Sequence, residues 1–170
     1  MPPRPRHLIP ALALLAACSG GASPKGVLQS VRSAFSPQAA PPDTIPEMLD
    51  YSPDLQVNVA DMARSPEGVL WRELAPGDSA GGVATTGDSV EVGYLGWLPS
   101  GLLVDSGFAA VRVGAGSVLT GIDLGIPGMQ PGGRRKLVIP PGLGYGAEGL
   151  GDIPPLAVLV YDLELVRIIR

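Results

Sequence analysis

The stretch SVLTGIDLGIPGMQPGGRRKLVI at residues 117–139 decides the fold, because a short helical pattern in it is followed by a strand. Val118, Leu119 and Ile122 stand at helical spacing, and Ser117 before them is a candidate N-cap. The Pro-Gly pair that follows ends this helix. The closing RRKLVI then predicts a strand.

Further strand patterns flank this stretch on both sides. Three of them precede the predicted helix (residues 117–126): residues 69–74, 88–97 and 111–113. The last run, LAVLVYDLELVRII at residues 156–169, is the longest, with alternate apolar side chains on one face and Asp162 and Glu164 on the other. Because many strands accompany one short helix, we predict an α+β fold, an antiparallel twisted sheet wrapped around that helix.

The N-terminus has the pattern of an export signal. Arg4 and Arg6 precede an apolar run, LIPALALLAA at residues 8–17, which is too short to span a bilayer as a helix. Small residues and Cys18 follow, and LAAC resembles the bacterial lipobox. We therefore predict a lipoprotein signal peptide over residues 1–17 and lipidation of Cys18. An ordinary secretory signal that ends near a cysteine is the alternative.

The remainder divides by composition into three parts. Residues 18–46 are rich in Ser, Gly, Ala and Pro and predict a flexible tether. Residues 47–67 predict an N-terminal extension packed on the domain, and residues 68–170 the domain itself. Ser19, rather than aspartate, follows the cysteine. We therefore expect a lipid anchor in the cell envelope, at the periplasmic face of the outer membrane if the organism has two membranes.

Composition excludes several classes of function. The net charge is -4, so the chain lacks the basic surface on which nucleic-acid binding depends. His7 and Cys18 are the only histidine and cysteine, so the mature chain has no His-based triad and no zinc site of Cys and His. The GDSAG at residues 77–81 and the GYGAEG at residues 144–149 match a serine-nucleophile and a dinucleotide motif only in their letters. Both are predicted turns or loops.

A set of motifs from Val90 onward resembles the FKBP family of peptidyl-prolyl isomerases. In chain order the motifs are VGYLGW (92–97), VDS (104–106), VLTGID (118–123), RRKLVIP (134–140), GYGA (144–147), IPP (153–155) and LVYDLEL (159–165). The resemblance covers about half of the chain as one block. It implies the FKBP fold, in which the sheet wraps around the helix, and isomerisation of peptide bonds that precede proline, with no cofactor and no metal.

The resemblance also implies a proline pocket. Its catalytic members are Tyr94, Asp105 and Tyr145, and its substrate-binding members are Val104, Val118, Leu119, Ile122, Ile153 and Tyr161. The Tyr145 hydroxyl and the Leu119 backbone amide would hold peptide carbonyls. Tyr94 would hydrogen-bond the Asp105 carboxylate and fix its position.

This sequence departs from the family pattern at three pocket positions. Ile122 stands where the family has a tryptophan on the pocket floor, and Val104 where it has a phenylalanine. In the short loop after Ser106, the expected aromatic residue is Phe108 at best, and Ala109 is the more literal match. Two functions therefore remain open, an isomerase that helps exported proteins fold and a peptide-binding chaperone or adaptor with little turnover.

Overall fold

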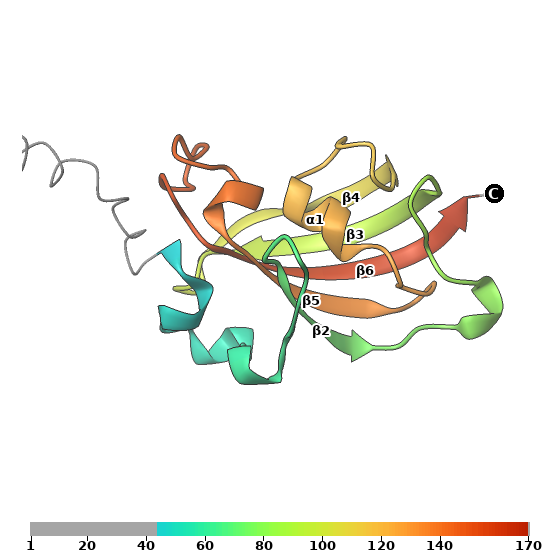
Figure 1. Cartoon of the computed structure of the whole chain (residues 1–170), viewed down its shortest axis with the longest axis horizontal. Coiled ribbons are helices and arrows are strands. Elements are labelled where there is room, and N and C mark those ends of the chain that lie inside the picture. The colour runs from blue at the N-terminus through green and yellow to red at the C-terminus, as the bar shows by residue number, and fades with distance from the viewer. Residues whose placement is uncertain (1–43, 170) are drawn as a thin grey trace, which may run out of the picture. The chain divides into compact units, whose positions relative to one another are not determined.

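The computed structural model describes residues 44–169, in which an antiparallel six-stranded sheet wraps around one short helix (Figure 1). The strands lie in the order β1-β2-β5-β6-β3-β4, so segments far apart in sequence pair at the centre. Their bounds are β1 Ala63–Arg64, β2 Leu70–Ala75, β3 Ser89–Trp97, β4 Leu103–Arg112, β5 Arg134–Ile139 and β6 Leu159–Ile169. The helices are α1 Thr120–Gly125 and the 3-10 turns η2 Pro46–Met48, η3 Pro53–Leu55, η4 Val59–Asp61, η5 Ser79–Gly81 and η6 Pro141–Leu143. The predicted fold class is confirmed.

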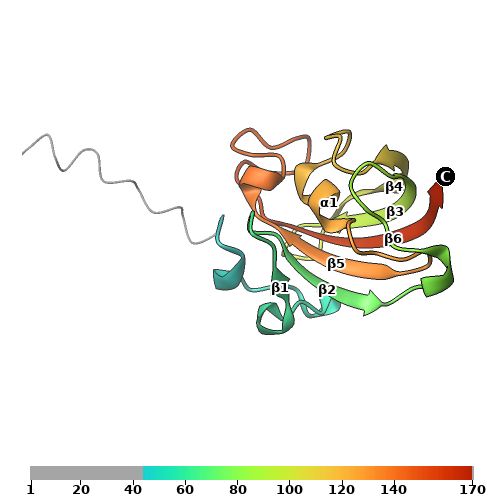
Figure 2. The ribbon, with the colours of Figure 1, turned by 45° about the vertical axis from the view of Figure 1, so that its right-hand side comes forward.

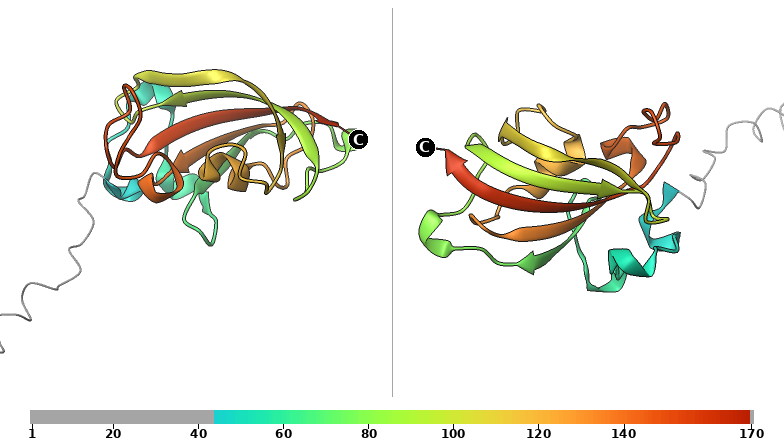
Figure 3. Two further views of the ribbon diagram at one scale, coloured as in Figure 1. Left: turned by 90° about the horizontal axis from the view of Figure 1, so that it is seen from above. Right: turned by 180° about the vertical axis from the view of Figure 1, so that it is seen from behind.

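Strand β6 shows why the sheet has one face against the helix. Tyr161 and Leu163 are at most 1% exposed and belong to the main core. Glu164, the next residue of the strand, is exposed on the opposite face. Successive side chains of a strand point to opposite faces, so the predicted alternation follows from the pleat. We call the face that carries Tyr161 the helix-side face and the other the outer face. Figure 3 shows the sheet from above, where the strands arch past α1, and from behind.

Helix α1 packs closely on strand β5. A methyl group at Gly121 would collide with Ile139, and one at Gly125 with Leu137. Glycine at both positions lets the helix backbone approach the strand, which holds the helix in the concavity of the sheet.

The helix begins later than the sequence predicts. Its N-cap is Leu119, which makes no side-chain cap hydrogen bond, so the prediction of Ser117 as N-cap was wrong. The predicted helix is present, but it spans Thr120–Gly125 rather than residues 117–126. Val118 and Leu119 belong instead to the loop that enters the helix. Their apolar spacing reflects packing on the core rather than helical backbone.

Strand β4 is longer than predicted, and β6 is shorter. The sequence indicated a strand only at residues 111–113, but β4 is ten residues long and pairs with β3 through nine of them. Because β4 contains several small side chains, its sequence shows no clear alternation of apolar and polar residues. The strand is instead defined by its pairing with β3. Strand β6 starts three residues later than predicted because Leu156 has a positive φ of 59°, which keeps the chain in a turn.

Residues before β2 cover part of the outer face. Leu55 is 5% exposed and packs in a second apolar cluster with Val138 and Val160 of the sheet, and partly buried Tyr51 and Trp97 lie against it. This explains the continuous apolar run in β6, because Val160 is buried on the outer face as fully as Tyr161 is on the other. No helix of residues 44–169 has the length and hydropathy needed to cross a bilayer. The predicted signal peptide and Cys18 lie outside the described residues.

Candidate functional site

The side chains that the resemblance implies come together on the helix-side face. Strands β3, β4 and β6, helix α1 and the two loops beside α1 supply them, and Figure 2 shows the loop before α1 and the loop after β5 on either side of the helix. All apolar and aromatic members lie in or against the main core cluster: Tyr94, Val104, Val118, Leu119, Ile122, Tyr145, Ile153 and Tyr161.

Burial divides these side chains into a floor and a rim. Tyr161, Ile122 and Ile153 are 0%, 4% and 5% exposed, and we call them the floor of the candidate pocket. Tyr94 and Tyr145, like Val118 and Leu119, are partly buried and stand around it. A mostly apolar site with a few polar groups at fixed places is the usual form of a binding site for a small organic group.

Asp105 is the charged group of the site, and its partner differs from the expected one. The Tyr161 hydroxyl donates a hydrogen bond to an Asp105 carboxylate oxygen at 2.8 Å. Among the described residues the Tyr94 hydroxyl makes no hydrogen bond to Asp105, so the predicted role of Tyr94 in fixing this carboxylate was wrong. The Tyr94 ring instead lies tilted against Tyr161, with ring centroids 6.3 Å apart.

The two tyrosines are held in their neutral form. Burial, together with the hydrogen bond to Asp105, raises the pKa of Tyr161 well above its usual range. Burial and the nearby Asp105 carboxylate also raise the pKa of Tyr94. Both hydroxyls therefore remain hydrogen-bond donors across the physiological range, and neither can act as a base there.

A bulge in β4 brings Val104 and Asp105 to the same side. Gly96 pairs with Asp105 and Trp97 with Leu103, so Val104 is the extra residue between the two pairs. Val104 packs against the main core, and the carboxylate beside it reaches Tyr161. Sequence alternation alone would have placed the two side chains on opposite faces.

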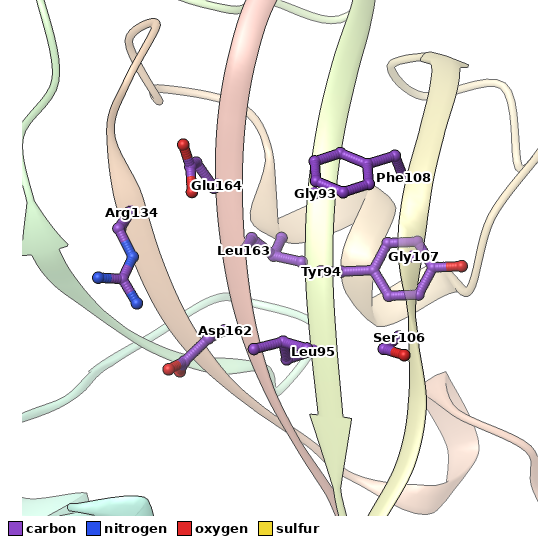
Figure 4. Close-up of a pocket in the computed structure, with 10 residues that line it drawn as sticks. All are labelled: Gly93, Tyr94, Leu95, Ser106, Gly107, Phe108, Arg134, Asp162, Leu163 and Glu164. Carbon is purple, nitrogen blue, oxygen red and sulfur yellow. The ribbon is translucent and has the colours of Figure 1, made fainter.

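Phe108 lies outside the pocket, on the outer face of the sheet. Its side chain is 77% exposed, and its ring lies over Gly93 on the neighbouring strand (Figure 4). Ala109, the next residue, packs against the main core. The pocket therefore contains Ala109 at the position where the resemblance implies an aromatic ring.

A shallow cavity of about 380 Å³ opens beside Phe108 (Figure 4). Residues of β3, β4, β5 and β6 line it, among them Leu95, Arg134, Asp162 and Glu164. Leu95 and Glu164 alternate with the core residues of their strands, so this cavity faces away from the candidate pocket.

One residue of the site region was missed by sequence reasoning. Asp123 of α1 is 8% exposed, and its carboxylate accepts backbone hydrogen bonds from the loop that carries Val118 and Leu119. The sequence signal was an acidic residue on the buried side of an apolar helix. In residues 44–169 no group of three His, Cys, Asp or Glu side chains could hold a metal ion.

Comparisons with known proteins identify the family of this chain. The family model described as FKBP-type peptidyl-prolyl cis-trans isomerase matches residues 81–166. The peptidyl-prolyl cis-trans isomerase FKBP15-3 of Arabidopsis thaliana is 44% identical over 107 residues, which are 60% of this chain and 75% of that protein. An FK506-binding protein of Neisseria meningitidis serogroup C is 41% identical over 97 residues, 54% of this chain and 89% of that protein.

Solved structures show the same fold. AtFKBP13 superposes with a TM-score of 0.57 at 34% identity, over 64% of this chain and 98% of that one. FkpA from Escherichia coli superposes with a TM-score of 0.56 at 32% identity, over 64% of this chain and about half (51%) of that one. The chain therefore belongs to the family of FKBP-type peptidyl-prolyl cis-trans isomerases.

Proposed function

We propose that this chain catalyses cis–trans isomerisation of peptide bonds that precede proline, with the proline ring held on the floor of the candidate pocket. The observation that carries this proposal is the gathering of Ile122, Ile153 and Tyr161, nearly without exposed surface, beneath a rim of partly buried aromatic side chains. A pyrrolidine ring is apolar and compact, and such a floor matches it.

The chemistry needs no nucleophile. Rotation about a peptide bond meets a barrier of about 18–20 kcal/mol because resonance stiffens the C–N bond. At the twisted transition state this resonance is lost and the carbonyl is less dipolar. An apolar pocket therefore disfavours the planar ground state relative to the twisted state, which lowers the barrier.

The rim would orient the peptide around the bound ring. In this proposal the Tyr145 hydroxyl and the Leu119 backbone amide hold the carbonyls on either side of the proline. Asp105 contributes charge at one wall, where the hydrogen bond from Tyr161 fixes it. Orientation of this kind restricts the peptide to conformers close to the twisted state.

The proposal is tested by measuring isomerisation of proline tetrapeptides with the chain. NMR exchange between the cis and trans resonances is suitable because it needs no coupled protease. The expected result is acceleration over the uncatalysed rate, which has time constants of tens to hundreds of seconds at 25 °C. Exchange no faster than in buffer, at saturating peptide, would contradict the proposal.

A second function is favoured by one feature of the pocket. Ile122, Val104 and Ala109 stand where the resemblance implies aromatic rings, so less apolar surface contacts the proline. A peptide-binding chaperone or adaptor would bind proline segments in this cleft with little turnover. This function would be supported if added peptide shifts the Tyr145 and Ile153 resonances but does not accelerate cis–trans exchange of the peptide.

We also propose that the clients are exported proteins and that lipid on Cys18 anchors the chain in the cell envelope. The apolar run at residues 8–17 that ends in LAAC supports export and lipidation. Slow X-Pro isomerisation limits the folding of many chains, so an isomerase at the membrane surface would meet them as they emerge.

A further inference from the structure

Helix α1 cannot fix its own orientation. It has six residues, far fewer than an isolated helix needs to be stable, and its N-cap has no side-chain hydrogen bond. Its position must therefore be set by contacts with its surroundings. Those contacts matter to the pocket because Ile122 of this helix lies on the floor and Val118 and Leu119 directly precede it.

One end of α1 is held to the sheet by Arg135. This guanidinium donates to the carbonyl oxygens of Gly125 at 2.8 Å and Pro127 at 2.9 Å, and it is ion-paired with Glu73. The contacts of α1 with Leu137 and Ile139 secure the helix along its length. The body of the helix is thus anchored independently of the loop that precedes it.

The loop before α1 is held by Asp123. One carboxylate oxygen accepts from the Gly114 amide at 2.7 Å and the other from the Gly116 amide at 2.9 Å. Both glycines have a positive φ, 82° and 67°, so the amides turn inward to the carboxylate. The backbone N–H of Asp123 donates to the carbonyl of the N-cap Leu119 at 3.0 Å, which is the first hydrogen bond of the helix, so the Asp123 side chain adds two bonds to the loop beyond those of the helix itself.

We propose that Asp123 is a positioning residue for the wall of the proline pocket, acting through the backbone of the loop that carries Val118 and Leu119. Gly116 is only three residues from Leu119, so displacement of the loop at Gly116 moves both wall residues. Asp123 itself contacts no substrate. The inference rests on the proposed function, because it assigns Val118 and the Leu119 amide to peptide binding.

The test uses the full chain with Asp123→Asn, which keeps the shape and removes the charge. The matched control is Asp78→Asn, because the Asp78 carboxylate accepts a turn amide, Ala80, at 2.9 Å in an exposed turn of another part of the chain. Peptide affinity is measured by NMR titration with a proline tetrapeptide, and kcat is measured from cis–trans exchange of the peptide by NMR. The rate of amide hydrogen exchange is measured for each residue of the protein.

For Asp123→Asn we expect faster amide exchange at Gly114 and Gly116 and a Kd raised roughly tenfold, since charge-assisted hydrogen bonds are about twice as strong as neutral ones. The kcat at saturating peptide should fall less than the affinity, because the wall contacts the peptide in the ground state as well as in the transition state. Asp78→Asn should resemble the wild type. A folded Asp123→Asn protein with Kd within about twofold of wild type overturns the inference.

The wild type supplies a measurement that does not depend on the variant folding. Saturation with peptide should slow exchange at Gly114 and Gly116 further, because the bound peptide stabilises the loop that Asp123 holds. Unchanged exchange at both amides overturns the inference. Peptide affinity and amide exchange can both be measured without turnover. A wild type that binds peptide without catalysis would contradict the proposed isomerase function. The role of Asp123 would still be decided by the affinity and the exchange rates.

Discussion

At the scale of single residues, the site depends on which tyrosine reaches Asp105. The Tyr161 hydroxyl makes that hydrogen bond at 2.8 Å, and Tyr94 packs beside it. A hydrogen bond to a charged group contributes about 1.5–3 kcal/mol, whereas a hydroxyl without such a partner contributes little. The two tyrosines should therefore differ clearly when each is changed to phenylalanine.

Tyr161→Phe should lower the free energy of unfolding by about 1.5–3 kcal/mol, because Asp105 loses its donor while the ring keeps its packing. Tyr94→Phe is the matched control and should cost less than about 0.5 kcal/mol. Urea unfolding followed by circular dichroism measures both. Equal losses, or a larger loss for Tyr94→Phe, would show that Tyr94 holds the carboxylate in solution.

The floor residue Ile122 should limit turnover. A few tens of Å² of missing apolar contact at about 25 cal/mol/Å² correspond to about 1 kcal/mol, and each 1.36 kcal/mol in the barrier is about one decade in rate. We expect weak turnover in the wild type, and Ile122→Trp should raise kcat/KM up to roughly tenfold above it. Circular dichroism and thermal melting must first show an intact fold.

Tyr145→Phe should lower kcat/KM, whereas Ile122→Trp should raise it. Removal of one hydroxyl from a peptide carbonyl loses about 1 kcal/mol of transition-state stabilisation, so kcat/KM should fall roughly fivefold. NMR exchange of proline tetrapeptides measures both variants. An unchanged kcat/KM in Tyr145→Phe would remove this hydroxyl from the proposed mechanism.

At the scale of elements, the segment before β2 is held on the outer face by Tyr51. Its hydroxyl donates to the Pro46 carbonyl at 2.7 Å, and its ring lies against the cluster of Leu55 and Val160. Burial raises the pKa of Tyr51 to about 12. Because the unfolded chain has a tyrosine pKa of about 10, Tyr51 stabilises the fold fully below pH 10 and loses that contribution as pH rises towards 12.

Tyr51→Phe should therefore lose about 1 kcal/mol of stability at neutral pH and show a shallower loss between about pH 10 and pH 12 than the wild type. Unfolding free energies measured in urea across this range give both slopes. The other tyrosines titrate in both proteins, so the difference isolates Tyr51. Parallel slopes would mean that the Tyr51 hydroxyl is accessible to water in the folded state.

At the scale of the whole molecule, the location of the chain depends on the N-terminal sequence. If Cys18 is lipidated, the intact protein partitions into detergent, because several acyl chains each contribute about 0.8 kcal/mol per buried methylene. Cys18→Ala should leave the protein in the aqueous phase. Mass spectrometry of the mature N-terminus is the direct check, and an unmodified chain that starts at another residue would contradict the anchor.

The sequence by itself determined the features that depend on local pattern. Alternation in residues 156–169 gave the buried face of β6, RRKLVI gave the bounds of β5, and the Pro-Gly pair ended the helical pattern. The residues predicted for the pocket were taken from motifs that lie in short continuous runs, and their roles stay a prediction. These inferences hold because the period of a strand and the chemistry of a turn are properties of neighbouring residues.

Only the tertiary structure decided the contacts between distant segments. The donor to Asp105 is Tyr161, 56 residues away, and two tyrosines of the same face were candidates for it. The start of α1 at Thr120 and the role of Asp123 depend on where the preceding loop meets the helix. Such choices follow from the distances and hydrogen-bond geometry that packing imposes, and these are not encoded in the spacing of residues along the chain.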